Sequence, residues 1–423
     1  MKKLVLFTLI GALLFALLSG CSAKVEPAPV SIVAATDLHF AGREFHTYTG
    51  AFQRDSESNG SGKQMQYLDD ILDAFIDQML AQKPDYILLT GDLTYVGSKA
   101  SHEALAQRLS ALKAAGIQVL VVPGNHDITS ATYILPEGEP VDAPSVTPQE
   151  FREIYADHGY NGALSYDKNS LSYVYDTGKG SWIFMLDTNF QYGATFGELH
   201  EETMSWLKSQ LKRCKKAGAY PLLAGHHNLL VHNDRFRFGY VLGNCDALLS
   251  LAKQYGGDLY LSGHIHTQHI AREDGMTDIA GGSFAVYPHR YGTLTVNGSQ
   301  WEYTSQATNV SAYAKQIGSA DPCLLQYEQF GFQFFYDRAF EQAKESLSDL
   351  ISDADILSRL CDLIARANVN YFGGTPSAID LDDVASLRPF LSDTRWGDYL
   401  DTILDGTEDS IHADSMALQG AEG

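Results

Sequence analysis

Five apolar runs in this 423-residue chain end directly in short polar motifs rich in aspartate, asparagine and histidine. Each run has the length and composition of a buried strand, so each motif stands at a carboxyl end. In open α/β sheets, ligands gather at that edge. We expect all of these motifs to meet at one rim: Asp37-Leu38-His39, Gly91-Asp92, Gly124-Asn125-His126-Asp127, Gly225-His226-His227 and Gly263-His264-Ile265-His266.

The order of the expected elements predicts an α/β fold. The first strands, at 31–36, 85–90 and 117–122, are separated by helical patterns at 68–80 and 105–112. Strands that alternate with helices predict βαβ units and a largely parallel sheet. The second half adds expected helices at 199–216 and 246–254, and expected strands at 171–175, 182–186, 221–224, 258–261, 277–280, 284–287, 293–296 and 301–304.

Other segments break this pattern. Residues 41–62 and 128–170 show no clear periodicity, apart from a possible short helix at 149–156. Loops of this length in a compact domain are usually functional or disordered, so we expect walls of a substrate cleft, with surface excursions as the alternative. After residue 304 helical patterns replace strands, and we find no ligand-like cluster there.

The motif residues have the chemistry of a metal site. Carboxylates, a carboxamide and imidazoles suit hard-to-borderline divalent ions, and the set is larger than one four-ligand zinc site requires. Two adjacent metals are the simplest interpretation. The donor set is compatible with Mn, Fe, Zn or Co, so the sequence leaves the identity of the two divalent ions open.

In order, spacing and strand-end placement, the motifs resemble those of calcineurin-like metallophosphoesterases. The resemblance covers roughly residues 30–304 and implies an α/β/β/α sandwich over that range. The helical patterns that follow predict a mainly helical appendage at 305–423. It also implies two metals that share a carboxylate and a water. Carried over to this sequence, the first metal's ligands are Asp37, His39 and His266, the second metal's are Asn125, His226 and His264, and Asp92 bridges the two.

The same resemblance assigns the chemical steps. A hydroxide shared by the metals attacks phosphorus, and His126 protonates the leaving group. Relatives often orient this histidine with an acid three residues after the bridging aspartate. Here that position is Tyr95, which leaves Asp127 or a residue from elsewhere. In a His-His pair the first member is the family's ligand, so His227 is a supporting or substrate-facing candidate.

We therefore expect a metal-dependent phosphodiesterase that acts on a small phosphate ester. A phosphomonoesterase or nucleotidase of the same fold is the alternative, and a non-catalytic metal-binding scaffold or a solute-binding lipoprotein is disfavoured because the ligand set is complete. The motifs resemble the cyclic-nucleotide phosphodiesterase and purple-acid-phosphatase side of the family. Cyclic nucleotides are mainly intracellular, so nucleotides, phospholipid head groups and wall phosphodiesters are equally open as substrates of an exported protein.

The N-terminus predicts export. Two lysines precede an apolar stretch at 4–18 that is shorter than the roughly 20 residues of a membrane span, and Leu18-Ser19-Gly20-Cys21 resembles a lipobox. We expect a signal peptide at 1–20, lipidated Cys21 as the membrane anchor facing outside the cytoplasm, and a tether at 21–29. An ordinary signal peptide is the alternative. The other cysteines, Cys214, Cys245, Cys323 and Cys361, show no pairing pattern and suit small buried thiols at least as well as disulfides.

The net charge of the chain limits the classes of partner that we expect. The chain has 52 acidic against 30 basic residues, a formal net charge of −22. This excess repels nucleic acid over most of the surface, so a nucleic-acid polymer is not an expected partner. A small anionic substrate is compatible, because bound cations dominate their immediate surroundings. Arg235, Arg237 and Arg290 are weaker candidates for phosphate contact and suit solvated loops better.

Overall fold

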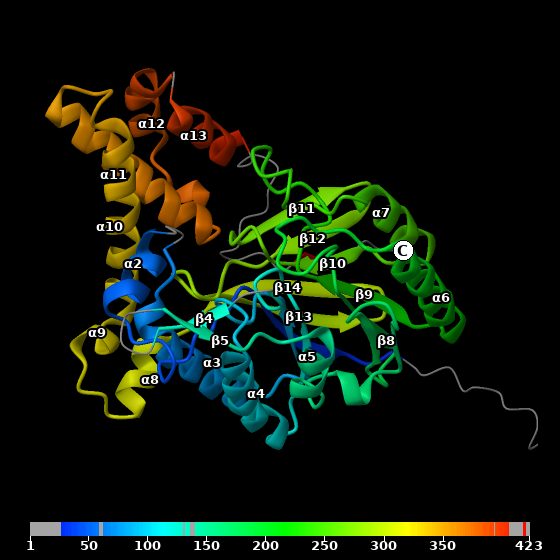
Figure 1. Ribbon diagram of the computed structural model, residues 1–423. Coiled ribbons are helices and arrows are strands. Elements are labelled where there is room, and N and C mark those ends of the chain that lie inside the picture. The colour runs from blue at the N-terminus through cyan, green and yellow to red at the C-terminus, as the bar shows by residue number, and fades with distance from the viewer. Residues whose placement is uncertain are drawn as a thin grey trace, which may run out of the picture.

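The computed structural model describes residues 27–58, 62–129, 132–135, 140–392, 394–405 and 418–419. Within them, two β-sheets lie between two layers of helices (Figure 1). This is the α/β/β/α sandwich that the sequence predicts. The expected lipidation site Cys21 and the signal peptide at 1–20 lie outside the described residues.

The first sheet has the strand order β15-β14-β13-β1-β2-β3. Strands β1, β2 and β3 run parallel, with Ala34 opposite Leu88 and Leu88 opposite Leu120. The other strands pair antiparallel. The bounds are β1 (Val30–Ala35), β2 (Tyr86–Thr90), β3 (Gln118–Val122), β13 (Arg290–Asn297), β14 (Gln300–Ala307) and β15 (Leu418–Gln419).

The second sheet has the order β11-β12-β10-β9-β8-β7-β6. Its central strands β8, β9, β10 and β12 run parallel, and the outer strands pair antiparallel. Antiparallel edges on a parallel centre are common in mixed sheets. The bounds are β6 (Ser165–Tyr166), β7 (Tyr173–Asp176), β8 (Ser181–Leu186), β9 (Tyr220–Gly225), β10 (Leu259–Ser262), β11 (His269–Glu273) and β12 (Met276–Ala280).

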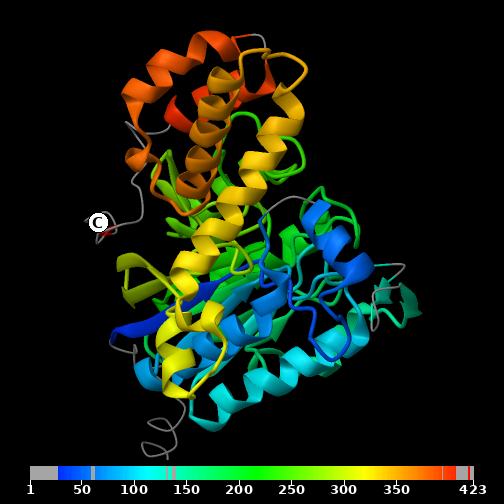
Figure 2. The ribbon, with the colours of Figure 1, turned by 90° about the vertical axis from the view of Figure 1, so that its left-hand side faces the viewer.

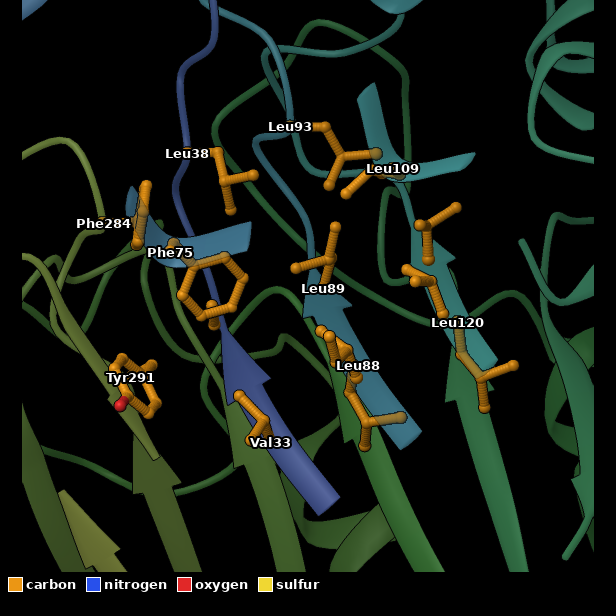
Figure 3. Packing of buried hydrophobic residues seen from close by; sticks show 14 of the residues in the cluster. Val33, Leu38, Phe75, Leu88, Leu89, Leu93, Leu109, Leu120, Phe284 and Tyr291 are labelled. Carbon is orange, nitrogen blue, oxygen red and sulfur yellow. The ribbon is translucent and has the colours of Figure 1, made fainter. Parts of the chain in front are cut away.

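Helices cover the outer face of each sheet. Helices α3 (Leu68–Gln82) and α4 (Lys99–Ala114) pack on the first sheet, and α6 (Glu201–Ala217) and α7 (Cys245–Gln254) pack on the second. Figure 3 shows Phe75 of α3 and Leu109 of α4 near strand residues such as Leu88, all fully buried. Burial of each such side chain contributes about 1.5–3 kcal/mol, which fixes the sheets and hence the strand ends.

Local signals set several helix ends. Thr147 and Glu150 form a reciprocal capping box at the start of α5 (Pro148–Ile154), the short helix expected near 149–156. Helix α6 ends at Gly218, whose φ of +73° a residue with a side chain rarely adopts. The long segments around the rim also contain α2 (Gly50–Ser58) and a hairpin of β4 (Thr132–Ile134) and β5 (Val141–Ala143).

The strand predicted at 284–287 is wrong. This apolar segment forms turns, with isolated bridges from Ser283 to Thr36 and from Val286 to Lys63. The amides of Phe284 and Ala285 donate to the carbonyls of Thr36 and Asp37 at 2.9 and 3.2 Å. The segment is apolar because it is buried behind the site loops, and a short apolar run alone does not distinguish such a loop from a strand.

The C-terminal region is mainly helical, as expected. Strand β14 extends to Ala307, three residues past the expected end of the strand pattern, and helices follow. A separate apolar cluster, which includes Leu360, Ile364, Leu387 and Leu400, holds the later helices together. The helices are α8 (Val310–Gln316), α9 (Pro322–Leu325), α10 (Tyr327–Leu347), α11 (Ala354–Phe372), α12 (Leu381–Leu387) and α13 (Arg395–Asp405).

The helical region is joined to the sandwich by buried polar contacts. Tyr327 of α10 donates to the Gln64 side chain and lies 3.0 Å from Nε2 of His289, and Gln64 donates to the carbonyl of Gly331 at 2.7 Å. Arg290 donates to the carbonyl of Gly373 at 2.8 Å. Figure 2 shows α10 and α11 rising along one side of the sandwich. The helices are therefore anchored to loops near the rim.

Four of the cysteines lie in the described part of the chain. Cys214, Cys245, Cys323 and Cys361 are free thiols, and Cys214 and Cys361 are buried. Within the described ranges, no helix combines the length and apolar character that a membrane crossing needs.

Candidate metal centre

The motif residues lie just beyond the strand ends, in loops with an unusual backbone. Asp37, His39, Asp92, His264 and His266 all have positive φ, from 45° to 67°. Left-handed backbone costs residues with side chains about 1–3 kcal/mol each and concentrates at functional sites. Left-handed turns therefore set the directions of these side chains.

The first group of donor atoms comes from Asp37, His39, Asp92 and His266, whose ligand atoms all lie within 4.8 Å of one another. Nε2 of His266 is 3.2 Å from Oδ1 of Asp37 and 3.2 Å from Nε2 of His39. Nε2 of His39 is 3.8 Å from Oδ2 of Asp92. Side chains from both sheets therefore converge on one point.

The second group contains Asp92, His226 and His264. Nε2 of His226 is 3.4 Å from Oδ1 of Asp92, 3.0 Å from Oδ1 of Asn125 and 3.2 Å from Nδ1 of His264. Asp92 belongs to both groups, with its two oxygens turned toward different partners. The structure thus assembles all the expected ligands in the expected grouping, and their coordination of metal stays a prediction.

The donor set fits divalent cations. Oδ2 of Asp37 accepts hydrogen bonds from Thr36 Oγ1 at 2.7 Å and from the His264 amide at 3.0 Å. Oδ1 of Asp37 is buried without a hydrogen-bond partner in the described structure and faces the cluster. A buried carboxylate oxygen left unpaired is costly, and a cation held at this point would satisfy it.

Backbone carbonyls fix two of the imidazoles. Nδ1 of His226 lies 3.0 Å from the carbonyl of Thr90, and Nε2 of His264 lies 2.9 Å from the carbonyl of Gly239. A carbonyl only accepts, so these nitrogens carry the protons. The other ring nitrogens, His226 Nε2 and His264 Nδ1, therefore face the site, which is the arrangement that metal-binding histidines require.

The electrostatics of the pocket also favour cations. Burial disfavours the Asp92 carboxylate, but the neighbouring His226 and His126 outweigh it and hold the pKa of Asp92 well below its usual value. Burial lowers the pKa of His264 to about 3, whereas Asp92 outweighs burial at His226 and raises its pKa to about 9. Two buried carboxylates thus draw positive charge into the cluster.

His126 stands beside the metal ligands and not among them. Its amide donates to Oδ1 of Asp92 at 2.9 Å, and its ring is edge-on to His39 with centroids 5.0 Å apart. Nδ1 of His126 lies 2.9 Å from the carbonyl of Tyr95, and Nε2 lies 4.0 Å from Oδ2 of Asp92. The side chain is 42% exposed, so it is open to solvent and to a ligand.

Asp127 does not orient His126. Its carboxylate is buried and accepts from the amides of Leu93, Thr94 and Gly124 at 3.0, 2.8 and 2.8 Å. Burial, followed by the charge of Asp92, raises the pKa of Asp127 to about 7. Asp127 ties the second and third motifs together, while the main chain of Tyr95 supplies the partner of the His126 ring.

His227 holds a loop in place. Nδ1 lies 2.8 Å from Oγ1 of Thr188, and Nε2 lies 3.0 Å from the carbonyl of Thr195. Both nitrogens are therefore occupied, and the residue is buried. Of the two roles considered for His227, the supporting one agrees with these contacts.

The weaker arginine candidates point elsewhere. Arg235 lies 3.5 Å from Asp398, Arg237 lies 2.7 Å from Asp234, and Arg290 donates to the carbonyl of Gly373. Lys63 was not a candidate site residue in the sequence, yet its charge acts on the site. Burial is the largest cause that lowers the pKa of His39, and the charge of Lys63 is the next; Lys63 also lowers the pKa of His266. No local pattern reveals Lys63, because its approach depends on the bridge to Val286.

Comparison with known families covers both parts of the chain. The profile of the calcineurin-like phosphoesterases matches residues 30–268, and one described as the C-terminal domain of cyclic nucleotide phosphodiesterase matches residues 309–409. The first match spans more than half of the chain. The protein belongs to the calcineurin-like phosphoesterase family, and it is a metal-dependent phosphoric ester hydrolase.

Individual relatives are distant. A 3′,5′-cyclic-nucleotide phosphodiesterase of Nostoc sp. is 26% identical over 244 residues, which cover 57% of this chain and 74% of the relative. A probable cyclic nucleotide phosphodiesterase of Moraxella catarrhalis is 27% identical over 188 residues, 44% of this chain and 60% of the relative, thus less than two thirds of its length. A dimetal phosphatase structure from Danio rerio aligns with a TM-score of 0.47 and 13% identity over 66% of this chain and 96% of that one.

Proposed function

We propose that the protein is a binuclear-metal phosphodiesterase whose substrates are 3′,5′-cyclic nucleotides. The observation that carries the proposal is the pair of donor groups joined by Asp92, with His126 at their edge. Support for the substrate comes from the relatives named for cyclic nucleotides and from the C-terminal match to a domain named for the same enzymes. The names of these relatives favour cyclic nucleotides over cell-wall and lipid phosphodiesters, which the expected export does not exclude as substrates.

The residues divide the work between binding and proton transfer. Asp37, His39 and His266 would hold one ion, Asn125, His226 and His264 the other, and Asp92 both. Divalent ions in such sites polarise phosphoryl oxygens and supply a nucleophilic water at neutral pH. The chain offers two carboxylates to balance their charge, and we expect the ester's leaving oxygen to face the exposed side chain of His126.

His126 is suited to donate a proton from Nε2. The Tyr95 carbonyl fixes the ring with Nδ1–H inward, so Nε2 is the only ring nitrogen turned to the cleft. In the proposed step Nε2 transfers its proton to the departing alkoxide, which leaves as the alcohol. Such proton transfer contributes about 10²- to 10⁴-fold in rate.

The test combines elemental analysis with a substrate panel. Purified protein should contain two divalent ions per chain and should convert cyclic AMP to 5′-AMP. It should cleave bis-p-nitrophenyl phosphate faster than p-nitrophenyl phosphate, and it should lose activity on chelation and regain it with Mn, Fe, Zn or Co. Faster cleavage of the monoester, or turnover of glycerophosphodiesters but not of cyclic AMP, would overturn the proposed specificity.

A further inference from the structure

Four aromatic side chains gather on two loops beside the metal centre, and we call Phe190, Phe196, His200 and Phe238 the aromatic patch. Phe190 stacks on His200 with centroids 4.8 Å apart, and Phe196 lies nearly parallel to Phe238 at 6.4 Å. Phe190 and Phe196 meet edge to face at 6.1 Å. The four rings form one continuous surface.

This surface contributes little to folding. Phe238 is 91% exposed and Phe190 is 45% exposed. Burial of a phenylalanine side chain stabilises a fold, and Phe238 contributes almost none of that stabilisation. Single exposed apolar residues are ordinary, but a group of them marks a binding surface.

The first loop, at residues 187–200, carries Phe190, Phe196 and His200. It contacts the fourth motif and a residue next to the third. The Thr195 carbonyl is held by His227, and the Asn189 side chain donates to the Pro123 carbonyl at 3.1 Å. A Cβ on Gly193 would lie 3.7 Å from the carbonyl oxygen of Ile128, just after the third motif. The loop that carries Phe190 and Phe196 therefore lies beside the loop that carries His126.

The second loop, which carries Phe238, contacts the second donor group. Gly239, whose carbonyl holds His264, directly follows Phe238. The Tyr240 ring lies 5.1 Å from the His264 ring. Consecutive Cα atoms are about 3.8 Å apart, so the backbone of Phe238 is one step from a residue that fixes a metal-site imidazole.

We propose that the aromatic patch binds the base of a nucleotide whose phosphate lies at the metal centre. The inference rests on the proposed function and adds to it a residue-level basis for recognising nucleotides. Phenylalanine faces offer stacking to any base and hydrogen bonds to none, so the patch accepts purines and pyrimidines alike. The nearest arginines of the second loop are already paired with Asp234 and Asp398, which leaves stacking as the main attraction.

Binding of 5′-AMP and of ribose 5-phosphate to the metal-loaded protein tests the proposal. The two ligands share the sugar and the phosphate, and only AMP has a base. Isothermal titration calorimetry should show tighter binding of AMP to the wild type by about tenfold or more, as stacking of one base predicts. Phe238→Ala should reduce the ratio of AMP affinity to ribose 5-phosphate affinity by about fivefold or more, and it should leave the affinity for ribose 5-phosphate unchanged.

Two variants serve as controls. Phe238→Tyr keeps a stacking face and should retain the preference, and Phe390→Ala, which truncates a 43% exposed phenylalanine of the helical region, should bind both ligands as the wild type does. Equal affinity of the wild type for AMP and ribose 5-phosphate would overturn the inference. So would a Phe238→Ala variant that keeps the preference or weakens both ligands equally. Absence of cyclic AMP turnover would overturn the proposed function separately, because calorimetry needs no turnover.

Discussion

Nδ1 of His126 lies 2.9 Å from the backbone oxygen of Tyr95, so a main-chain group orients the proposed acid. Mutation of the Tyr95 side chain leaves that oxygen in place. The position of the imidazole therefore depends on the loop that follows Asp92, and Asp92 itself accepts from the His126 amide. The proposed acid and the shared carboxylate are held as one unit.

His126→Ala should lower kcat by about 10²- to 10⁴-fold and leave the metal content near that of the wild type, because the proposed role of this side chain is proton donation and it belongs to neither donor group. The loss should be smaller for p-nitrophenyl esters, whose leaving group needs little protonation, than for alkyl esters. Steady-state kinetics and elemental analysis provide the measurements. An equal loss on both ester types would assign His126 to substrate positioning.

Asp92→Asn should reduce metal content and activity more than Asn125→Ala does. The carboxylate of Asp92 faces both donor groups and offsets the repulsion between two dications, whereas Asn125 contacts only the His226 side. Both variants should be measured by elemental analysis and hydrolysis at matched metal concentration. If Asp92→Asn keeps two tightly bound ions and near-normal turnover, Asp92 is not the bridge.

His289 should make stability fall at acidic pH. Burial lowers its folded pKa from 6.5 to about 4, so between these values the unfolded chain binds more protons and stability decreases as pH falls. From pH 7 to pH 5 the wild type should lose about 2 kcal/mol more than His289→Gln, which cannot take up the proton. Urea unfolding at the two pH values gives the difference. Parallel pH dependence of the two proteins would contradict this assignment.

Cys21→Ala should release the protein from the membrane without loss of phosphodiesterase activity, because the expected anchor precedes the sandwich in the chain. Fractionation and metabolic labelling with a radioactive fatty acid test this. Membrane retention of the variant, together with an unlabelled wild type, would rule out the lipid anchor.

The site is predictable from the sequence because the signals that mark it are local. Apolar runs followed by Asp37, Asp92, Asn125 and His226 mark carboxyl ends of parallel strands, and the fold brings such ends together. The left-handed turns at His39 and His266 were missed because no residue type there predicts positive φ. Glycine would have signalled such turns, but chemistry requires imidazoles at these positions.

Long-range partners were beyond prediction for a different reason. The contact from Gln64 to Gly331 joins residues 267 apart in the chain, and the bridge from Lys63 to Val286 depends on a buried segment that resembles a strand in sequence. Helical patterns indicated helices after residue 304, but nothing local indicated which loops these helices contact. Only the packed fold brings these segments together.

The junction between sandwich and helices uses main-chain oxygens. Gln64 reaches the carbonyl of Gly331, the Gln268 amide reaches that of Phe372 at 3.3 Å, and Arg290 reaches that of Gly373. Carbonyls persist through almost any substitution, so these three contacts survive when the helix sequences diverge, whereas those of the Tyr327 side chain with Gln64 and His289 do not. Covariation between aligned positions would then underestimate this coupling, and chimeras that exchange the helical region between relatives should tolerate low sequence identity as long as the backbone path is kept.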